Sequence, residues 1–489
     1  MRDTESGMSR RRFMQAGTLA AGGTAVASAV LGGSAAEAAT ARPRLPGPGG
    51  GASGWGYAEQ ILRRVQPPAF PDQEFPITSY GAVGNGTTDS TAAIAAAIAA
   101  CSLAGGGHVV VPAGTFLTGA IHLRSNVDLH LEKGATLRFS TDPGKYLPVV
   151  FTRWQGIEFY NYSPFIYAFT QENIGITGQG TLDGQASSTY WWPWKGETSY
   201  GWQPGQPSQE ADWDTITEMA RNNVPVYQRV FGAGHYIRPV FIQPFACRNV
   251  VISGVTILNS PNWEIVPELS CNVTVDGITI ESLGPNNDGC DVESCQDVVI
   301  QNCTFNTGDD CIALKAGRDT DARRVSVPCR DVVIQNCHFA NGHGGVTIGS
   351  EMTAGVANVY ARNIKMTSPN IDDAVRLKTN ARRGGYIRNI NVKDVTVSSV
   401  KTAGLHINYY YGSSAGYDYK PDVQDINLTN VTVGTCEYAV YLDGFPDDHI
   451  KDVTLTNCTF ASAAKPNVIE NADNVRFRAV TINGQPVSS

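Results

Sequence analysis

A short, β-rich unit that recurs along the chain is the sequence feature that most constrains its fold. The unit reads DVVIQNCTF at residues 297–305, DVVIQNCHF at 331–339 and DVTLTNCTF at 452–460. Looser copies begin at Arg248, Cys271, Ala357, Arg388, Asp425 and Asp473. Each copy alternates apolar with polar residues and is rich in Val, Ile and Thr. Because Asn or Gly interrupts each copy, the pattern predicts strands punctuated by turns, with no helical period.

The spacing of the copies predicts a stacked solenoid. Successive copies start roughly 23 to 37 residues apart, which is about the length of one solenoid coil. A leucine-rich repeat would show regular Leu spacing with Asn in a fixed register, and a propeller would need about four strands in each unit of ~40 residues. The chain shows neither pattern. We therefore predict an all-β protein with the architecture of a right-handed parallel β-helix.

One segment departs from the strand pattern. The Ala- and Ile-rich residues 90–103 begin at Asp89-Ser90, and both residue types are good helix N-caps. An open solenoid end exposes strand edges and apolar side chains. We predict a short helix here that covers the first coil.

Composition sets limits on domain number and on partners. A prior of one domain per ~150 residues would suggest three domains in 489 residues, but solenoids lengthen without adding separate cores. The chain is 42% hydrophobic, contains 51 glycines and carries a formal net charge of −8. No basic run lies outside the N-terminus, so we expect no nucleic-acid partner.

The N-terminus predicts export. Arg10, Arg11 and Arg12 precede a moderately apolar Ala/Gly/Val stretch, and Ala36-Glu37-Ala38 follows it. This order is typical of a twin-arginine (Tat) signal cleaved after Ala38. A membrane anchor is the alternative, but the apolar stretch is short and full of Gly and Ala. We expect a secreted protein without membrane association, with a signal at 1–38, a linker and N-terminal extension at 39–70, and one β-helix domain at 71–489.

The chain has eleven cysteines, an odd number that leaves at least one free thiol. Cys303, Cys337 and Cys458 occupy the same position of the repeat, which predicts small core residues that face inward. Four others lie near expected loops and leave room for one disulfide: Cys290, Cys295, Cys311 and Cys329. No cysteine spacing resembles a zinc site.

Four polar motifs follow one another at intervals of one repeat. They are Asn286-Asn287-Asp288, Gly308-Asp309-Asp310, Gly342-His343-Gly344 and Arg376-Leu377-Lys378. Aligned strands would place Asp288 one coil from Asp310, and Asp309 one coil from His343. Adjacent parallel strands lie ~4.8 Å apart, so these four side chains should fall within about 10 Å. Arg376 and Lys378 would arrive from the next coil, on one strand face.

These residue types suit the hydrolysis of an anionic sugar polymer. Glycoside hydrolysis needs a carboxylic acid that protonates the leaving oxygen and a carboxylate that activates water or attacks. Crowded carboxylates repel one another, so at least one of them keeps its proton near neutral pH. His343 would assist that protonation or hold a substrate hydroxyl, and Arg376 and Lys378 would bind a substrate carboxylate.

Each motif alone has a simpler explanation. Asp-Asp and Asn-x-Asp in a β-solenoid are most often turn residues that bond their own backbone. A Gly-His-Gly sequence is a weak signal, and Arg-x-Lys on a strand is usually a solvated face. It is their position in register on consecutive coils that favours a catalytic site.

At these residues the chain resembles family 28 of the glycoside hydrolases, the polygalacturonases. The four motifs have the order and approximate spacing of that family, and the resemblance runs from about Phe75 to the C-terminus. Asn287 departs from it, since many members have Thr there. The resemblance implies an inverting hydrolysis of α-1,4-linked galacturonate without a metal or other cofactor.

The resemblance also implies roles for individual residues. Asp309 would be the general acid, with His343 supporting it, and Asp288 and Asp310 would hold and activate the water. Arg376 and Lys378 would bind the galacturonate carboxylate, with Asn286 as a further substrate contact. The family places a Tyr after the Arg-x-Lys coil, for which Tyr411 is the best match. Three consecutive tyrosines leave a surface aromatic ladder as the alternative for Tyr411.

A long segment between Gly184 and Gln243 is rich in Trp, Tyr and Pro. Aromatic rings stack on sugars and long loops can wall off one end of a groove, so we expect an exo-acting enzyme. Arg229, His235 and Arg238 could then hold a terminal carboxylate. The alternative is that this segment is simply a packed lid.

Three rival functions stay open. One is hydrolysis of rhamnogalacturonan or another pectic polymer, although the intact motif set favours homogalacturonan. A second is a calcium-dependent pectate lyase on the same fold, with a basic residue that abstracts a proton. The third is a non-catalytic carbohydrate-binding solenoid. We expect a monomer whose partner is a pectic polysaccharide or oligogalacturonide.

Overall fold

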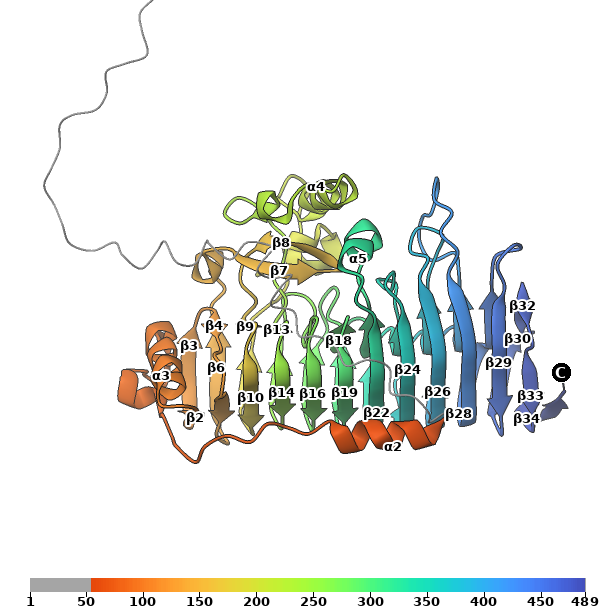
Figure 1. Cartoon of the computed structure of the whole chain (residues 1–489), viewed down its shortest axis with the longest axis horizontal. Coiled ribbons are helices and arrows are strands. Elements are labelled where there is room, and N and C mark those ends of the chain that lie inside the picture. Colours follow the sequence, from red (N-terminus) through yellow and green to blue (C-terminus); the bar gives the residue numbers. More distant parts are fainter. Residues whose placement is uncertain (1–53, 489) are drawn as a thin grey trace, which may run out of the picture. The chain divides into compact units, whose positions relative to one another are not determined.

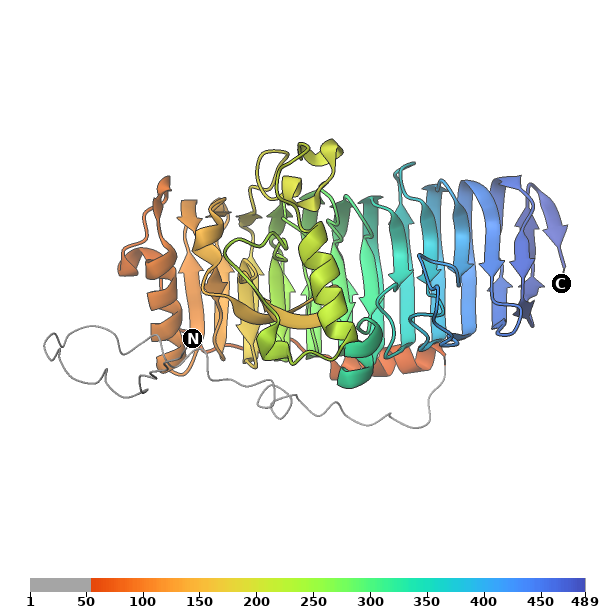
Figure 2. The same ribbon diagram turned by 90° about the horizontal axis from the view of Figure 1, so that it is seen from above.

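The computed structural model describes residues 54–488, and the predicted right-handed parallel β-helix is confirmed. Its strands form three parallel ladders that run along the solenoid (Figures 1 and 2). The export signal predicted at 1–38 and the linker predicted at 40–53 lie outside the described residues. Within the described part of the chain, no helix is long and apolar enough to cross a membrane.

The first ladder contains the repeat units. Its strands are β2 (Gly107–Val111), β5 (Val127–Leu131), β10 (Glu172–Gly178), β14 (Arg248–Ser253), β16 (Cys271–Asp276), β19 (Gln296–Gln301), β22 (Cys329–Asn341), β24 (Val356–Met366), β26 (Tyr386–Ser399), β28 (Asp422–Asp443), β29 (Ile450–Thr456), β32 (Ala472–Asp473) and β33 (Arg476–Arg478).

The second ladder follows the first around a corner of each coil. It consists of β1 (Asn85–Asp89), β3 (Gly114–Thr118), β6 (Ala135–Phe139), β11 (Thr181–Asp183), β15 (Thr256–Leu258), β17 (Thr279–Ser282), β20 (Thr304–Thr307), the later parts of β22, β24, β26 and β28, then β30 (Thr459–Lys465) and β34 (Val480–Ile482).

The third ladder begins with β4 (Ile121–His122), β9 (Ile166–Phe169) and β13 (Ile242–Phe245). It continues with β18 (Cys290–Glu293), β21 (Ile312–Lys315), β23 (Gly344–Ile348), β25 (Asp373–Lys378), β27 (Ala403–Asn408), the end of β28 and β31 (Val468–Glu470). The four polar motifs predicted to form the site lie at or beside the strands of this third ladder.

The Asn of each repeat unit makes the corner between the first two ladders. Asn302, Asn336 and Asn457 have φ values of 57°, 57° and 52°, in the left-handed region that Asn tolerates better than most residues. The side-chain amides of neighbouring coils also bond to one another. Nδ2 of Asn336 donates to Oδ1 of Asn302 at 3.2 Å, and Nδ2 of Asn363 donates to Oδ1 of Asn336 at 2.7 Å.

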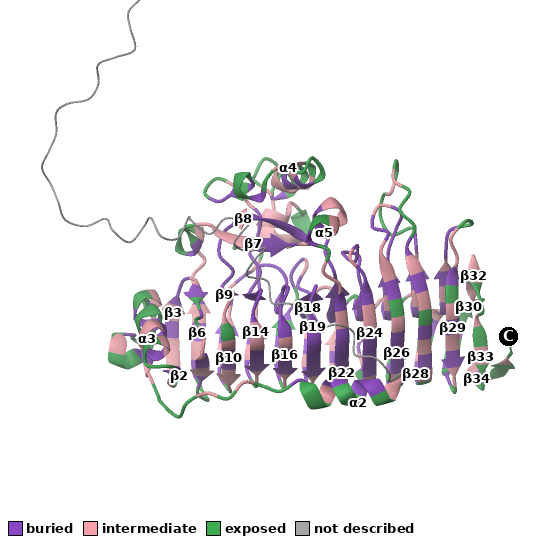
Figure 3. Cartoon of the chain, in the orientation of Figure 1, coloured by how far each residue is buried: buried purple, intermediate pink, exposed green. Residues whose placement is uncertain are grey.

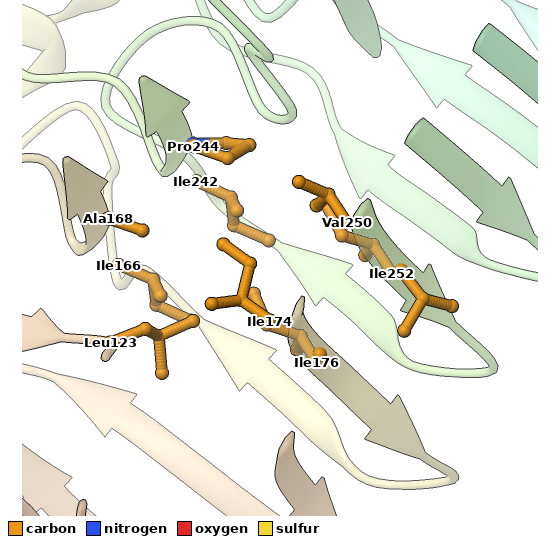
Figure 4. A pocket seen from close by; sticks show the side chains of 11 residues that line it. Leu123, Ile166, Ala168, Ile174, Ile176, Ile242, Pro244, Val250 and Ile252 are labelled. Atoms are coloured by element: carbon orange, nitrogen blue, oxygen red, sulfur yellow. The ribbon is translucent and has the colours of Figure 1, made fainter. Parts of the chain in front are cut away.

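The interior of the solenoid is a continuous apolar core (Figure 3). Figure 4 shows the aliphatic side chains of adjacent coils facing one another at one level of this core: Leu123, Ile166, Ala168, Ile174, Ile176, Ile242, Pro244, Val250 and Ile252. Cys303, Cys337 and Cys458 are buried in it, as predicted. All eleven cysteines are free and buried, so the disulfide allowed for among Cys290, Cys295, Cys311 and Cys329 does not form.

Both ends of the coil stack are covered. Helix α3 (Thr91–Leu103) is the predicted capping helix, and its buried face includes Ile94 and Ile98. Its N-cap is Ser90, while the side chain of Asp89 accepts a hydrogen bond from the amide of Thr91. At the other end, β35 (Gln485–Val487) turns back antiparallel to β34. Both devices reduce the exposed strand edge.

Three helices were not predicted from the sequence. Helix α2 (Trp55–Arg64) lies across the first ladder, where Tyr57, Ala58 and Ile61 pack on apolar residues of β19, β22 and β24. The other two, α4 (Glu210–Arg221) and α5 (Asp319–Val325), lie in loops beside the third ladder (Figure 1). Five 3₁₀ turns are η1 (Ile77–Tyr80), η2 (Pro143–Tyr146), η3 (Trp192–Lys195), η4 (Thr198–Tyr200) and η5 (Val226–Gln228).

Two segments that connect strands of the second ladder to strands of the third form a lid, defined here as residues 150–161 and 186–240. Strands β7 (Val150–Trp154), β8 (Ile157–Asn161) and β12 (Val230–Phe231) make its small sheet. Apolar residues of this sheet and of α4 pack together on Trp263 and Val266, which belong to the solenoid. The lid is therefore attached to the solenoid by its own apolar cluster.

Candidate active site

The predicted stacking of the motifs is present in the strand register. Cys290 pairs with Ile312, Ile312 with Val346, and Gly344 with Asp373, so the coils align in the expected frame. Backbone bonds extend this frame into the loops before the strands. The amide of Asp309 donates to the carbonyl of Asn287 at 3.2 Å, and the amide of His343 donates to the carbonyl of Asp309 at 2.9 Å.

Asp309 and His343 form an ion pair. Nδ1 of His343 lies 3.3 Å from Oδ1 of Asp309, and both side chains remain partly exposed. Burial raises the pKa of Asp309, but the hydrogen bond and charge of His343, together with the charge of Lys378, outweigh burial and lower it to about 2. The same hydrogen bond raises the pKa of His343. The pair therefore holds its proton on the imidazole when nothing else is bound.

Asp288 and Asp310 lie beside this pair and are buried. Oδ2 of Asp310 lies 2.5 Å from Nζ of Lys378, and Oδ2 of Asp288 lies 3.4 Å from Nζ of Lys315. In both carboxyl groups Oδ1 is buried and has no hydrogen-bond partner among residues 54–488. Two acceptors are thus free to hold a small polar molecule such as water.

The electrostatics give Asp288 a different state from Asp309. Burial raises the pKa of Asp288 well above its usual range, and the charges of Asp291 and Asp309 raise it further. Asp288 consequently keeps its proton to higher pH than Asp309 does. Crowded carboxylates separate in this way because they cannot all carry charge at close range.

The glycines of the motifs leave room for these carboxylates. A Cβ on Gly344 would lie 2.6 Å from Oδ1 of Asp310 and 2.1 Å from Oγ1 of Thr347. A Cβ on Gly308 would lie 2.2 Å from the carbonyl oxygen of Gly284. All three distances are far below van der Waals contact, so no larger residue fits without moving the backbone, Thr347 or an acid.

Arg376 and Lys378 project from one face of β25, between the inward residues Val375 and Leu377. The guanidinium of Arg376 lies 5.8 Å and Nζ of Lys378 lies 5.3 Å from the ring centre of Tyr411. The predicted tyrosine therefore lies beside the predicted cations. Nε of Arg376 is 3.2 Å from Oδ2 of Asp373, which holds the guanidinium in place.

The two asparagines of the first motif differ in role. Nδ2 of Asn286 lies 3.5 Å from Oδ2 of Asp309, so this residue contacts the candidate acid. Asn287 is fully buried, accepts from Ser282 and Gly284, and donates to the carbonyls of Ser260 and Asn262. Its departure from the family pattern thus affects a turn and leaves the carboxylates unchanged.

The predicted terminal contacts are placed differently from expectation. Arg229 is buried, pairs with Asp321 at 2.8 Å and donates to the carbonyls of Val224 and Glu158, so it stabilises the lid. Arg238 is also fully buried, behind Asn286. Because the packed lid buries both side chains, neither guanidinium is available to a substrate carboxylate, contrary to the prediction. Nδ1 of His235, a partly exposed residue, is 2.7 Å from Oδ1 of Asp212 within the lid.

Other lid residues do reach the site. Nε1 of Trp192 donates to the carbonyl of Ser260 at 2.9 Å, and its indole lies against Gly284, two residues before Asn286. Burial raises the pKa of Tyr200, and the charges of Glu197 and Asp309 add to this effect. The aromatic lid segment thus borders the carboxylates on the side of Asn286.

The sequence did not lead us to predict Lys315 as a residue of the site. Its Nζ lies 2.7 Å from Asp291, 3.4 Å from Asp288 and 3.6 Å from Glu351, and it stacks 3.6 Å from the ring centre of Trp263. A signal was available, because the register places Lys315 and Lys378 in the same column of the third ladder. Lys378 pairs with the buried Asp310, whereas Lys315 faces three buried acids.

The acids could also be compared with a metal site. One oxygen each of Asp288, Asp309 and Asp310 lie within 4.8 Å of one another. However, Lys315, His343 and Lys378 each face one of these carboxyl groups. A divalent cation would have to compete with three protein cations, so the residues present suit acid–base chemistry better than metal binding.

Comparison with known proteins agrees with this geometry. Residues 228–480 match the family model "Glycosyl hydrolases family 28", and residues 75–132 match the model "Rhamnogalacturonase A/epimerase, pectate lyase-like". The chain is 44% identical to an exopolygalacturonase from Thermotoga maritima, whose crystal structure superposes with a TM-score of 0.86 over 88% of this chain and 96% of that one.

Curated sequences give the same result. The chain is 30% identical over 406 residues to a probable polygalacturonase of Vitis vinifera, which covers 80% of this chain and 74% of the relative. It is 27% identical over 436 residues to an exo-poly-alpha-D-galacturonosidase of Dickeya chrysanthemi, covering 83% and 70%. The carboxylate cluster on a parallel β-helix, together with these matches, shows that the protein is a glycoside hydrolase and belongs to glycosyl hydrolase family 28.

Proposed function

We propose that this protein is an exo-polygalacturonase that hydrolyses α-1,4-linked galacturonate from the non-reducing end of polygalacturonate. The observation that carries the proposal is the Asp309–His343 pair beside Asp288 and Asp310, with Arg376 and Lys378 one strand away. Two cations in a carboxylate site suit an anionic sugar. The similarity to the Thermotoga exopolygalacturonase and the Dickeya exo-poly-alpha-D-galacturonosidase supports the exo mode.

We propose that Asp309 and His343 together supply the proton for the leaving oxygen. The pair holds one proton, which resides on His343 in the free enzyme. As the glycosidic oxygen accepts this proton through Asp309, the C–O bond breaks and the sugar develops positive charge at its anomeric carbon. A proton donor of this kind typically accelerates such a step by about 10²–10⁴-fold.

The water would be held by the free Oδ1 atoms of Asp288 and Asp310. Asp288 carries a proton and donates it in a hydrogen bond to the water, while Asp310 accepts the proton that the water loses as its oxygen attacks. Because Asp310 is paired with Lys378 and Asp288 is protonated, neither is a free anionic nucleophile. This arrangement favours single displacement, and therefore inversion, although the closest oxygens are nearer than the ~6.5–9.5 Å common between the carboxyl groups of inverting enzymes.

The exo mode has a structural support of its own. Trp192 and Tyr200 of the lid border the carboxylates on the side of Asn286. Arg376, Lys378 and Tyr411 lie on the other side, toward the later coils. A chain that enters past Tyr411 would end against the lid, which would leave room for few sugars beyond the cleaved bond.

The remaining parts of the proposal concern the environment of the enzyme. We propose metal-independent activity, because three protein cations already face the three acids. We also propose export through the twin-arginine signal at 1–38, followed by action of a single catalytic domain at 71–489 on extracellular pectin. A protein that lacks residues 1–12, and with them the three arginines, should then remain with the cells that make it.

One experiment tests the activity. The mature protein is incubated with polygalacturonate and EDTA, and products are resolved over time, with the anomer formed first observed by proton NMR. Galacturonate released from the start as the β-anomer, and lost in Asp309→Asn, is the expected result. A ladder of saturated oligomers would overturn the exo mode. A parallel incubation replaces EDTA with calcium, and unsaturated products formed only there would replace hydrolysis with the lyase reaction.

A further inference from the structure

Arg238 is a buried cation with an unusual set of partners. Its side chain is fully buried, and among the described residues it forms no ion pair with a carboxylate. Burial lowers its pKa to about 9, so the guanidinium is still charged at neutral pH. A buried charge is costly unless hydrogen bonds satisfy it, and such residues usually have a specific role.

Four hydrogen bonds satisfy the guanidinium. Nη1 donates to the carbonyls of Pro261 at 2.8 Å and Pro285 at 2.7 Å, which lie in two successive coils. Nε donates to Oε1 of Gln209 at 2.9 Å, and Nη2 donates to Oδ1 of Asn286 at 2.8 Å. Arg238 thus joins the lid, two coils of the solenoid and the first site motif.

The bond to Asn286 decides which way its amide points. Arginine can only donate hydrogen bonds, so the atom of Asn286 that faces it must be the carbonyl oxygen. The NH₂ group then faces Asp309, 3.5 Å from Oδ2. Oδ1 of Asp309 is the oxygen near His343, so Asn286 and His343 hold the two oxygens of one carboxylate.

We propose that Arg238 is a positioning residue that fixes the amide of Asn286 as a donor to Asp309 and so makes the orientation of the acid depend on the docked lid. This inference rests on the proposed role of Asp309 as the proton donor. The connection to the lid runs through Gln209, the N-cap residue of α4. The backbone amide of Gln209 donates to the carbonyl of Trp194 at 2.7 Å. Displacement of the lid would therefore release Asn286 and leave one oxygen of Asp309 unheld.

The test compares two substrates. Cleavage of polygalacturonate needs a proton on a poor leaving group, whereas 4-nitrophenyl α-galacturonide has a leaving group that departs with little help. Arg238→Met should lower kcat on the polymer by about 10–100-fold, within the range of proton-donor effects, with KM changed less than about twofold. The kcat on the nitrophenyl substrate should fall by less than about threefold. A structural defect would lower both rates equally, which would overturn the proposal.

Matched variants complete the design. Arg229→Met removes another buried arginine of the lid and should lower the thermal midpoint while leaving the ratio of the two kcat values unchanged. Asn286→Ala should reproduce the selective loss, and the double variant with Arg238→Met should lose no more than Asn286→Ala alone, because the two residues act on one path. Additive losses would refute the path. If Arg238→Met fails to fold, Arg238→Lys and Asn286→Ala carry the same comparison.

Asp309→Asn separates this inference from the proposed function. If this variant shows no selective loss on the polymer, the proposed acid itself is wrong. If it shows the loss and Arg238→Met and Arg238→Lys do not, the acid stands and the positioning role of Arg238 is wrong.

Discussion

Nδ1 of His343 lies 3.3 Å from Oδ1 of Asp309, one coil away, and their backbones are joined by a 2.9 Å hydrogen bond from the histidine amide to the aspartate carbonyl. The strand ladder therefore brings the two groups together and does not depend on a flexible loop to do so. Because the pair shares one proton, its chemistry is that of a unit, and replacement of either member should affect the other.

The first prediction concerns the acid. Asp309→Asn should lower kcat on polygalacturonate by about 10²–10⁴-fold, since the leaving oxygen loses its proton donor. KM should change little, because Arg376, Lys378 and Tyr411 still bind the sugar. Initial rates over a range of substrate concentrations measure both constants. A variant with more than about half the normal kcat would exclude Asp309 as the acid.

The second prediction concerns pH. His343 has a raised pKa, and the pair donates only while it holds its proton, so activity should fall as the pH rises through that pKa, above about 6.5. In His343→Gln the proton must be held by Asp309 alone. Without the histidine charge and bond the alkaline limit should move to lower pH. An unchanged profile of kcat/KM against pH would show that His343 does not share the proton.

The third prediction concerns Arg376. Its guanidinium is a planar fork held by Asp373 beside Tyr411, which suits a bidentate bond to a carboxylate. Arg376→Lys keeps the charge and loses the fork, and should raise KM for polygalacturonate by about tenfold, equivalent to ~1.4 kcal/mol. Esterified substrate offers no carboxylate, so its KM should change much less. Equal changes for both substrates would argue against a carboxylate contact.

The fourth prediction concerns Gly344. The added methyl of Gly344→Ala would lie 2.6 Å from Oδ1 of Asp310, one of the two oxygens proposed to hold water. We expect kcat to fall by at least about 10²-fold, as for other displaced catalytic groups. Circular dichroism and the thermal midpoint would show whether the β-helix is retained. A folded, fully active variant would show that this oxygen is not used.

The fifth prediction concerns stability. Burial raises the pKa of Asp291 to about 7 and that of Asp288 well above its usual range, so near pH 6 the folded state binds protons that the unfolded state has lost. Since the folded state binds more protons, the free energy of unfolding should fall as the pH rises from about 5 to 8. Thermal midpoints across this range measure the slope. Asp291→Asn should flatten it, and an unchanged slope in that variant would assign the effect elsewhere.

Much of the fold was visible in the sequence because the repeat units encode it directly. Alternation and Asn corners predicted the ladders, and the motif frame predicted that Asp288 stacks on Asp310. The structure of the lid could not be predicted from this pattern, because α4 belongs to no repeat unit that would fix its position. Its apolar face packs on Trp263, from which a long loop separates it in the sequence. Helix α2 was missed because its packing partners, Val299 and Tyr360, are distant in the chain.

The relative positions of the candidate site residues were predicted correctly where they follow the ladder, and incorrectly where they depend on the lid. Asp309, His343 and Lys378 take the expected relative positions. The partners of Arg229 and Arg238 are set by how the lid packs, and a sequence cannot show that a guanidinium faces inward toward Asp321 or Asn286. Lys315 was overlooked although its column was already implied by the frame.

The stacked register has a consequence for how such enzymes can vary. The loops that join the strands of successive coils differ in length. The site residues still meet, because each has a fixed position relative to the start of its own strand in the third ladder. Inserted residues between Lys315 and Cys329, the loop that contains α5, would lengthen a loop and leave the distances intact. One residue inserted within β21 would instead turn Lys315 into the apolar core and Leu314 out of it. Insertions among related sequences should therefore accumulate in the loops between the strands and be nearly absent within the strands.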